Sequence, residues 1–203
     1  MQAITLPQAI YDEIIVHARE GKPEEICGIL RGRGREAFEL FRAENVATER
    51  IENYDVDAQS LMKQFEFEDA GDEMMGIYHS HPVSVAWPSA TDAWNAHYPE
   101  SYYLICSLEY DDAPVIRAFR MLATFPDVDG EALRRVLPFR EVRRGLFGYY
   151  QAVGQPTPDT LHNAAAGIAA PFYVVFNVDE SGGVDELRIV GLTEHPVWIV
   201  RHS

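Results

Sequence analysis

The sequence has few cysteines and no long apolar run. Its two cysteines, Cys27 and Cys106, cannot form a disulfide framework, and they lack the clustering of a structural zinc site. Both lie in apolar, strand-like runs, so we expect two buried thiols; one disulfide between strands is the alternative. No apolar run is long enough to span a bilayer, and the N-terminus lacks the basic start and apolar core of a signal peptide. These absences predict a cytoplasmic protein that does not enter the membrane.

Basic residues are also scarce. The 203 residues include 17 Lys and Arg against 32 Asp and Glu, a formal net charge of −15. Such a chain repels phosphate backbones, which argues against nucleic acid as a partner and favours a partner with a basic face. The 47% hydrophobic and 24% charged content is ordinary for a globular protein.

The chain divides into two segments of different pattern. Up to residue 122, strand-like runs alternate with helical ones; we expect a first helix at Leu6 or Pro7 with Thr5 as its cap. From residue 123, a basic stretch, a Pro- and Gly-rich loop and a hairpin with an SGG turn follow. We therefore predict a mixed α/β domain over residues 1–122 and an α+β extension over residues 123–203. Five arginines of the extension either form a solvated face or meet an acidic surface: Arg134, Arg135, Arg140, Arg143 and Arg144.

The stretch GIYHSHPVSVAWPSATD carries the clearest chemical signal. Side chains alternate along a strand, so His79 and His81 point to the same side and both can reach one metal ion. Asp92 is the nearest candidate for a third ligand, if residues 82–88 fold back beside the strand end. Two histidines and one carboxylate leave a fourth tetrahedral position for water, as in a catalytic zinc site.

The same stretch also has a purely structural interpretation. A His-x-His pair is common by chance, and Ser89 to Asp92 has the spacing of a helix capping box. Ser89 is able to serve as a cap and still face a site. For Asp92 the two interpretations conflict, because a metal would engage its carboxylate.

Hydrolysis also requires a group that takes a proton from water and returns it to the leaving amine. Glu25 is the candidate, because it starts the strand EICGIL and shares a face with Cys27 and Ile29. A carboxylate at the mouth of an apolar strand is poised for a raised pKa. The alternative is an ordinary solvated glutamate next to Glu24.

The sequence resembles the signature of the JAMM/MPN+ zinc metalloproteases, small prokaryotic type. The resemblance is carried by Glu25, the His79-Ser80-His81-Pro82 run and Ser89-x-x-Asp92. The similarity extends over residues 1–122. It implies the JAMM/MPN-type, cytidine-deaminase-like fold, a mixed β-sheet flanked by helices. It also implies zinc on His79, His81 and Asp92, Glu25 as the catalytic acid and base, and Ser89 as a catalytic residue that stabilises the oxyanion.

The implied reaction is hydrolysis after the C-terminal Gly-Gly tail of a ubiquitin-like or sulfur-carrier protein. Either release from a target lysine or trimming of the carrier's own C-terminus fits this resemblance. The alternative function is a metal-containing module that binds ubiquitin-like proteins without cleaving them, since the extension is able to block a cleft. The oligomeric state stays open, a homodimer included.

Overall fold

The computed structural model describes residues 2–201 and divides into two compact units. The first contains residues 2–87, 100–120 and 194–201, and the second contains residues 88–99 and 121–193. The units do not follow the boundary predicted at residue 122. Residues 88–99 belong with the second unit, and the last strand returns to the first. The division into a domain of residues 1–122 and an extension of residues 123–203 describes a change of sequence pattern and stays a proposal.

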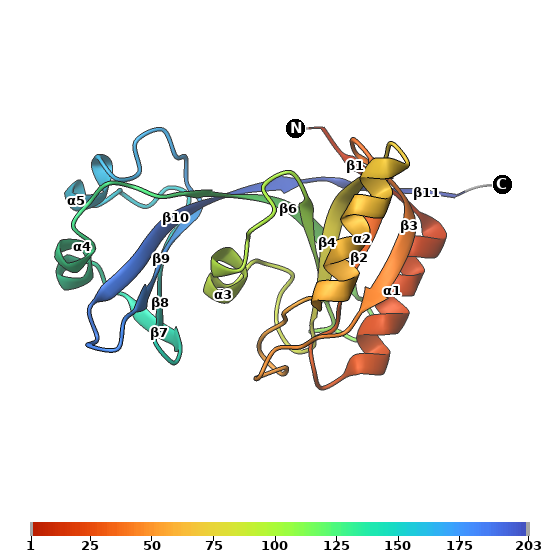
Figure 1. The fold of residues 1–203 in the computed structure, drawn as a ribbon, viewed down its shortest axis with the longest axis horizontal. Helices are drawn as coiled ribbons and strands as arrows, with labels where there is room; N and C mark the ends of the chain where they lie inside the picture. The colour runs from red at the N-terminus through yellow and green to blue at the C-terminus, as the bar shows by residue number, and fades with distance from the viewer. Residues whose placement is uncertain (1, 202–203) are drawn as a thin grey trace. The chain divides into compact units, whose positions relative to one another are not determined.

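The first unit is built on a mixed sheet in the order β11-β1-β3-β2-β4-β5-β6 (Figure 1). Its strands are β1 (Ile4–Pro7), β2 (Cys27–Arg33), β3 (Glu36–Ala43), β4 (Glu73–His81), β5 (Tyr102–Ser107), β6 (Val115–Thr124) and β11 (Val197–Val200). Pairing is parallel between β1 and β11, β1 and β3, and β4 and β5, and antiparallel between the other neighbours. The predicted mixed α/β fold is confirmed.

Two helices flank this sheet, α1 (Gln8–Gly21) and α2 (Ala58–Asp69). In α1, Ile10, Ile14 and Ala18 recur every four residues and form a buried stripe. This stripe belongs to a core cluster with Leu30 of β2 and Tyr78 of β4, which both point to the α1 side of the sheet. Since side chains alternate, His79 and His81 point to the opposite side.

The predicted cap of the first helix is wrong. Thr5 lies in β1, where its amide donates to the carbonyl of Arg35 at 2.7 Å, and the helix begins only after Pro7. By contrast, α2 has a side-chain cap, because Asp57 accepts from the amide of Ser60 at 2.8 Å.

The second unit is an antiparallel sheet in the order β10-β9-β8-β7 with three short helices. Its elements are α3 (Ala90–Trp94), α4 (Gly130–Val136), β7 (Arg140–Arg143), β8 (Leu146–Gln151), α5 (Asp159–His162), β9 (Phe172–Val178) and β10 (Val184–His195). Leu133 of α4 and Leu161 of α5 share a core cluster with Phe172, Val174 and Ile189. One face of this sheet is therefore covered by α4 and α5.

Cys27 and Cys106 are both buried and unbonded, as expected. Burial raises the pKa of each thiol to about 12, so neither is a nucleophile near pH 7. Within residues 2–201, no helix has the length and apolar character needed to cross a membrane.

Candidate metal centre

The end of strand β4 places two imidazoles side by side. Every residue of β4 after Glu73 is buried, and His79 and His81 are respectively 0% and 5% exposed. Their Nε2 atoms lie 3.2 Å apart. Two nitrogens bound tetrahedrally to one zinc at about 2.05 Å would be about 3.4 Å apart. The predicted alternation along the strand thus gives a spacing suited to a single ion.

Neighbouring groups fix the orientation of both rings. Nδ1 of His81 lies 2.8 Å from the carbonyl oxygen of Val85, which can only accept, so Nδ1 carries the proton. The Nε2 lone pair of His81 is thereby turned toward the site, as in metal-binding histidines generally. The ring of Tyr54 stacks on His79 with centroids 4.1 Å apart and planes at 17°.

Asp92 lies in α3 and takes part in a complete capping box. The amide of Ser89 donates to Oδ2 of Asp92 at 2.7 Å, and the amide of Asp92 donates to Oγ of Ser89 at 3.0 Å. The capping bond uses one carboxylate oxygen of the two. The capping bond by itself therefore does not exclude metal binding by Asp92.

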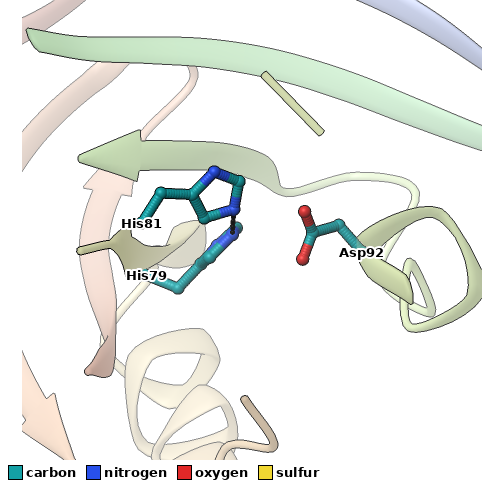
Figure 2. A group of neighbouring side chains, drawn as sticks. All are labelled: His79, His81 and Asp92. Atoms are coloured by element: carbon teal, nitrogen blue, oxygen red, sulfur yellow. Dashed lines mark hydrogen bonds between the residues drawn. The ribbon is translucent and has the colours of Figure 1, made fainter. Parts of the chain in front are cut away.

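His79, His81 and Asp92 together form a candidate metal-binding group. One ligand atom from each lies within 4.8 Å of the others, and all three residues are buried. Figure 2 shows the Asp92 carboxylate directed toward the two imidazoles. Two imidazole nitrogens and one carboxylate oxygen are donors that zinc accepts, and three protein ligands are the number found in catalytic zinc sites. The donor set therefore fits a catalytic zinc ion.

Glu25 lies on the same side of the sheet as the two histidines. It is 7% exposed and precedes β2, whose first residue, Cys27, pairs with His79. The pairing continues beyond the strand, since the amide of Ser80 donates to the carbonyl of Ile26 at 3.0 Å. Alternation then puts Glu25 on the face of Cys27 and His79 and brings it alongside His81.

The loop after β3 holds the backbone at Glu25 in place, a feature missed in the sequence. Nδ2 of buried Asn45 donates to the carbonyls of Glu25 and Asn53, at 2.8 and 3.0 Å. Its Oδ1 accepts from the amides of Ala47 and Asp55. Asn45 thus ties Glu25 to the loop that carries Tyr54. No local pattern marks Asn45, which lies in a mixed polar stretch between Glu44 and Val46.

Three contacts hold α3 against the rest of the second unit, and none has a local sequence signal. The hydroxyl of Tyr173 donates to the carbonyl of Pro88 at 2.9 Å, just before the helix. At the other end of the helix, Arg188 donates to the carbonyl of Trp94 at 2.7 Å. The guanidinium carbon of Arg188 also stacks on the Trp94 ring, 4.0 Å from its centroid. Between them, a Cβ on Gly148 would lie 2.6 Å from that of Ala90. Only glycine permits this approach.

The family model for prokaryotic homologs of the JAB domain matches residues 7–122. The chain belongs to this family. The predicted membership of the small prokaryotic JAMM/MPN type is therefore confirmed. All five predicted site residues lie inside the matched segment, whereas residues 123–203 lie outside it.

Similar proteins match about half of the chain. The desampylase of Haloferax volcanii is 43% identical over 103 residues, which are 47% of this chain and 74% of the desampylase. The CysO-cysteine peptidase of Mycobacterium tuberculosis is 30% identical over 119 residues, which are 56% of this chain and 79% of the peptidase. A solution structure of a Desulfitobacterium hafniense protein matches at 34% identity with a TM-score of 0.51, covering 57% and 82% of the two chains.

Proposed function

We propose that this protein is a zinc-dependent peptidase or isopeptidase that hydrolyses the bond after the C-terminal tail of a ubiquitin-like or sulfur-carrier protein. The observation that carries the proposal is the buried donor set of His79, His81 and Asp92, with ligand atoms within 4.8 Å of one another. Glu25 on the same side of the sheet supports it. Membership of the JAB family and the names of the desampylase and the CysO-cysteine peptidase support it further.

Bound by His79, His81 and Asp92, zinc would supply a Lewis acid that polarises a carbonyl and lowers the pKa of water to about 7. Glu25 takes the proton of the attacking water and delivers it to the leaving amine. Because Glu25 is only 7% exposed, little bulk water reaches its carboxylate to compete for that proton.

Ser89 stabilises the carbonyl oxygen as negative charge develops on it. Its Oγ accepts the capping bond from the amide of Asp92, and a hydroxyl that accepts one bond still has its proton to donate. Removing one such donor from an oxyanion site costs about 10²–10³ in kcat. The cap fixes Oγ, so the donor is ordered before substrate arrives.

The substrate tail is proposed to end in Gly-Gly before the bond that is cut. Side-chain-free residues allow a peptide backbone to approach a buried centre closely. Both release from a lysine and trimming of a carrier's C-terminus use the same chemistry, because the bond is an amide in each case.

The test compares two adjacent glutamates in the zinc-loaded protein. Glu25→Gln keeps the size of the buried side chain and removes the proton acceptor, so kcat on a carrier fusion should fall by roughly 10²–10⁴ with zinc retained. Glu24→Gln alters the exposed neighbour and should stay within about twofold of the parent. Cleavage is followed by mass spectrometry, and zinc by elemental analysis.

Two outcomes would contradict the proposal. Equal cleavage by Glu25→Gln and the parent would remove Glu25 from the mechanism. Tight binding of a carrier to zinc-loaded parent protein without hydrolysis would favour the alternative function, a binding module.

A further inference from the structure

The second unit contains a cavity of about 580 Å³ next to Ser89. This volume lies within the usual range of small-molecule sites, about 300–1,000 Å³. Its polar and aromatic lining includes Ser89, Arg140, Tyr149, Tyr150, Gln155 and Tyr173. All of these except Ser89 lie outside the segment that matches the JAB family. The cavity is thus a property of this chain's own extension.

One face of strands β7, β8 and β9 forms the floor of this cavity. Arg140 pairs with Gly148 across β7 and β8, and Tyr150 pairs with Tyr173 across β8 and β9. Residues 148 and 150 are two apart, so these four residues share a face. The opposite face carries Val174 and is buried under α4 and α5. The tyrosine face is covered only in part, by the start of α3 over Gly148.

Arg140 is the single charged residue of the lining. Its side chain is exposed, and within residues 2–201 no carboxylate oxygen lies within 4 Å of it. Two other arginines of this unit are engaged: Arg188 with Glu186 and Trp94, and Arg134 with Gly182. In a chain of net charge −15, a lining with one guanidinium and no carboxylate favours an anion.

The two tyrosine rings that border the cavity are suited to contact a side chain of a bound peptide rather than a backbone without side chains. The rings of Tyr150 and Tyr173 lie 4.9 Å apart, and both border the cavity. The Tyr173 hydroxyl is already bonded to the carbonyl of Pro88, so its ring position is fixed. A glycine would leave such a cavity empty. A residue with a carboxylate and a side chain of moderate size would fill it.

We propose that the cavity binds the residue on the leaving side of the scissile bond, and that Arg140 pairs with a carboxylate of that residue. The proposal rests on the proposed function, because it uses Ser89 as the residue shared by the cavity and the reacting carbonyl. The Gly-Gly side of the bond has no side chain to place there. A planar guanidinium accommodates a carboxylate through two parallel hydrogen bonds.

The carboxylate has two sources. It is the free α-carboxylate when the enzyme trims a terminal residue, and an acidic side chain when the chain continues. A free α-carboxylate next to the bond that is cut would make the protein a trimming peptidase, since a target lysine inside a chain offers none.

The experiment measures peptide affinity by fluorescence anisotropy in the full, zinc-loaded chain carrying Glu25→Gln to prevent turnover. The peptides end in Gly-Gly-Tyr with a free carboxylate, Gly-Gly-Tyr amide and Gly-Gly-Glu amide. The free acid should bind about tenfold more tightly than the Tyr amide, and Arg140→Gln should abolish that difference. Tighter binding of the Glu amide than of the Tyr amide would assign the acidic side chain as the source instead. Arg144→Gln, an exposed arginine outside the cavity, should leave all affinities unchanged.

Equal affinity of the three peptides in the Arg140-containing protein, or a preference that survives Arg140→Gln, would overturn the inference. Hydrolysis is assayed separately in protein with Glu25 intact. Cleavage without any dependence on Arg140 leaves the proposed function standing and removes the subsite. Arg140-dependent binding without cleavage supports a carboxylate site and rejects the proposed function.

Discussion

The two halves of the metal-binding group are held in different ways. His79 and His81 lie in a central strand with hydrogen-bonded neighbours on both sides, β2 and β5. Ser89 and Asp92 lie at a five-residue helix whose ends are held by single bonds from Tyr173 and Arg188. A helix this short has little stability of its own. Regular backbone pairing thus orients the histidines, while side chains of the second unit determine where the carboxylate lies.

This difference gives residues of the extension a structural role in holding α3. Tyr173 and Arg188 lie beyond residue 122, outside the family match, yet they contact the backbone next to Ser89 and Asp92. Substitutions in β4 should therefore act directly on the donor atoms, and substitutions in β9 or β10 should act through α3.

The largest expected effect comes from removing one donor of either half. His81→Ala and Asp92→Asn should each lose zinc and lower kcat/KM roughly a thousandfold or more, because the metal supplies several kcal/mol to the reaction. In Asp92→Asn, the amide oxygen of the introduced side chain is still able to accept from the Ser89 amide. The melting temperature of the metal-free protein should therefore change little.

Zinc content by elemental analysis and calorimetric melting curves check this prediction. Asp112→Asn, at an exposed acid, is the control for the loss of one negative charge. Full zinc occupancy in Asp92→Asn would remove Asp92 from the ligand set.

An intermediate effect is expected from the support of α3. Arg188→Ala loses a buried charged donor to the Trp94 carbonyl and its stacking on that ring, which should cost about 1–3 kcal/mol of stability. Zinc affinity, measured by chelator competition, should fall roughly tenfold, since Asp92 is no longer prepositioned.

Arg134→Ala provides the matched comparison. Arg134 also donates to a backbone carbonyl of the second unit, that of Gly182, and lies over Phe147. It is expected to affect stability with no change in zinc affinity. Equal losses of zinc affinity in both variants would show that the effect is not transmitted through α3.

The smallest effect concerns the first unit alone. The pKa of His17 is lowered from an ordinary 6.5 to about 4. Burial is the larger cause, and the positive charge of Arg42 is the second. The folded state therefore disfavours the protonated ring: its contribution to stability is full above pH 6.5 and is lost as the pH falls toward 4.

His17→Phe removes this titration. Between about pH 7.5 and pH 5, the parent's melting temperature should fall by roughly a few degrees more than that of the variant, followed by circular dichroism. If the melting temperatures of parent and variant changed equally with pH, the folded state would not disfavour protonation of His17. Zinc is left out of the buffers, so that the pH dependence of zinc binding does not contribute.

The sequence predicted those features that depend on local periodicity. Alternation placed His79 and His81 together, and the Ser89-x-x-Asp92 spacing gave the capping box. Thr5 was misjudged because a threonine before Leu-Pro is typical of a helix start, whereas β1 forms through pairing with β3 and β11, which lie far away in the sequence. Arg188 and Asn45 act through contacts to distant backbone, which no local pattern encodes.

The adjacency of β1 and β11 has a consequence for how the chain is made. Ile4 pairs with Val197, and Val200 pairs with Pro7, so two neighbouring strands at the edge of this sheet lie far apart in the sequence. During synthesis, β1 therefore waits with one side open until residues 197–200 have been translated, because β11 is its outer partner. Chaperones that bind exposed strand edges have that interval in which to act, and chains truncated before Val197 would prolong it indefinitely.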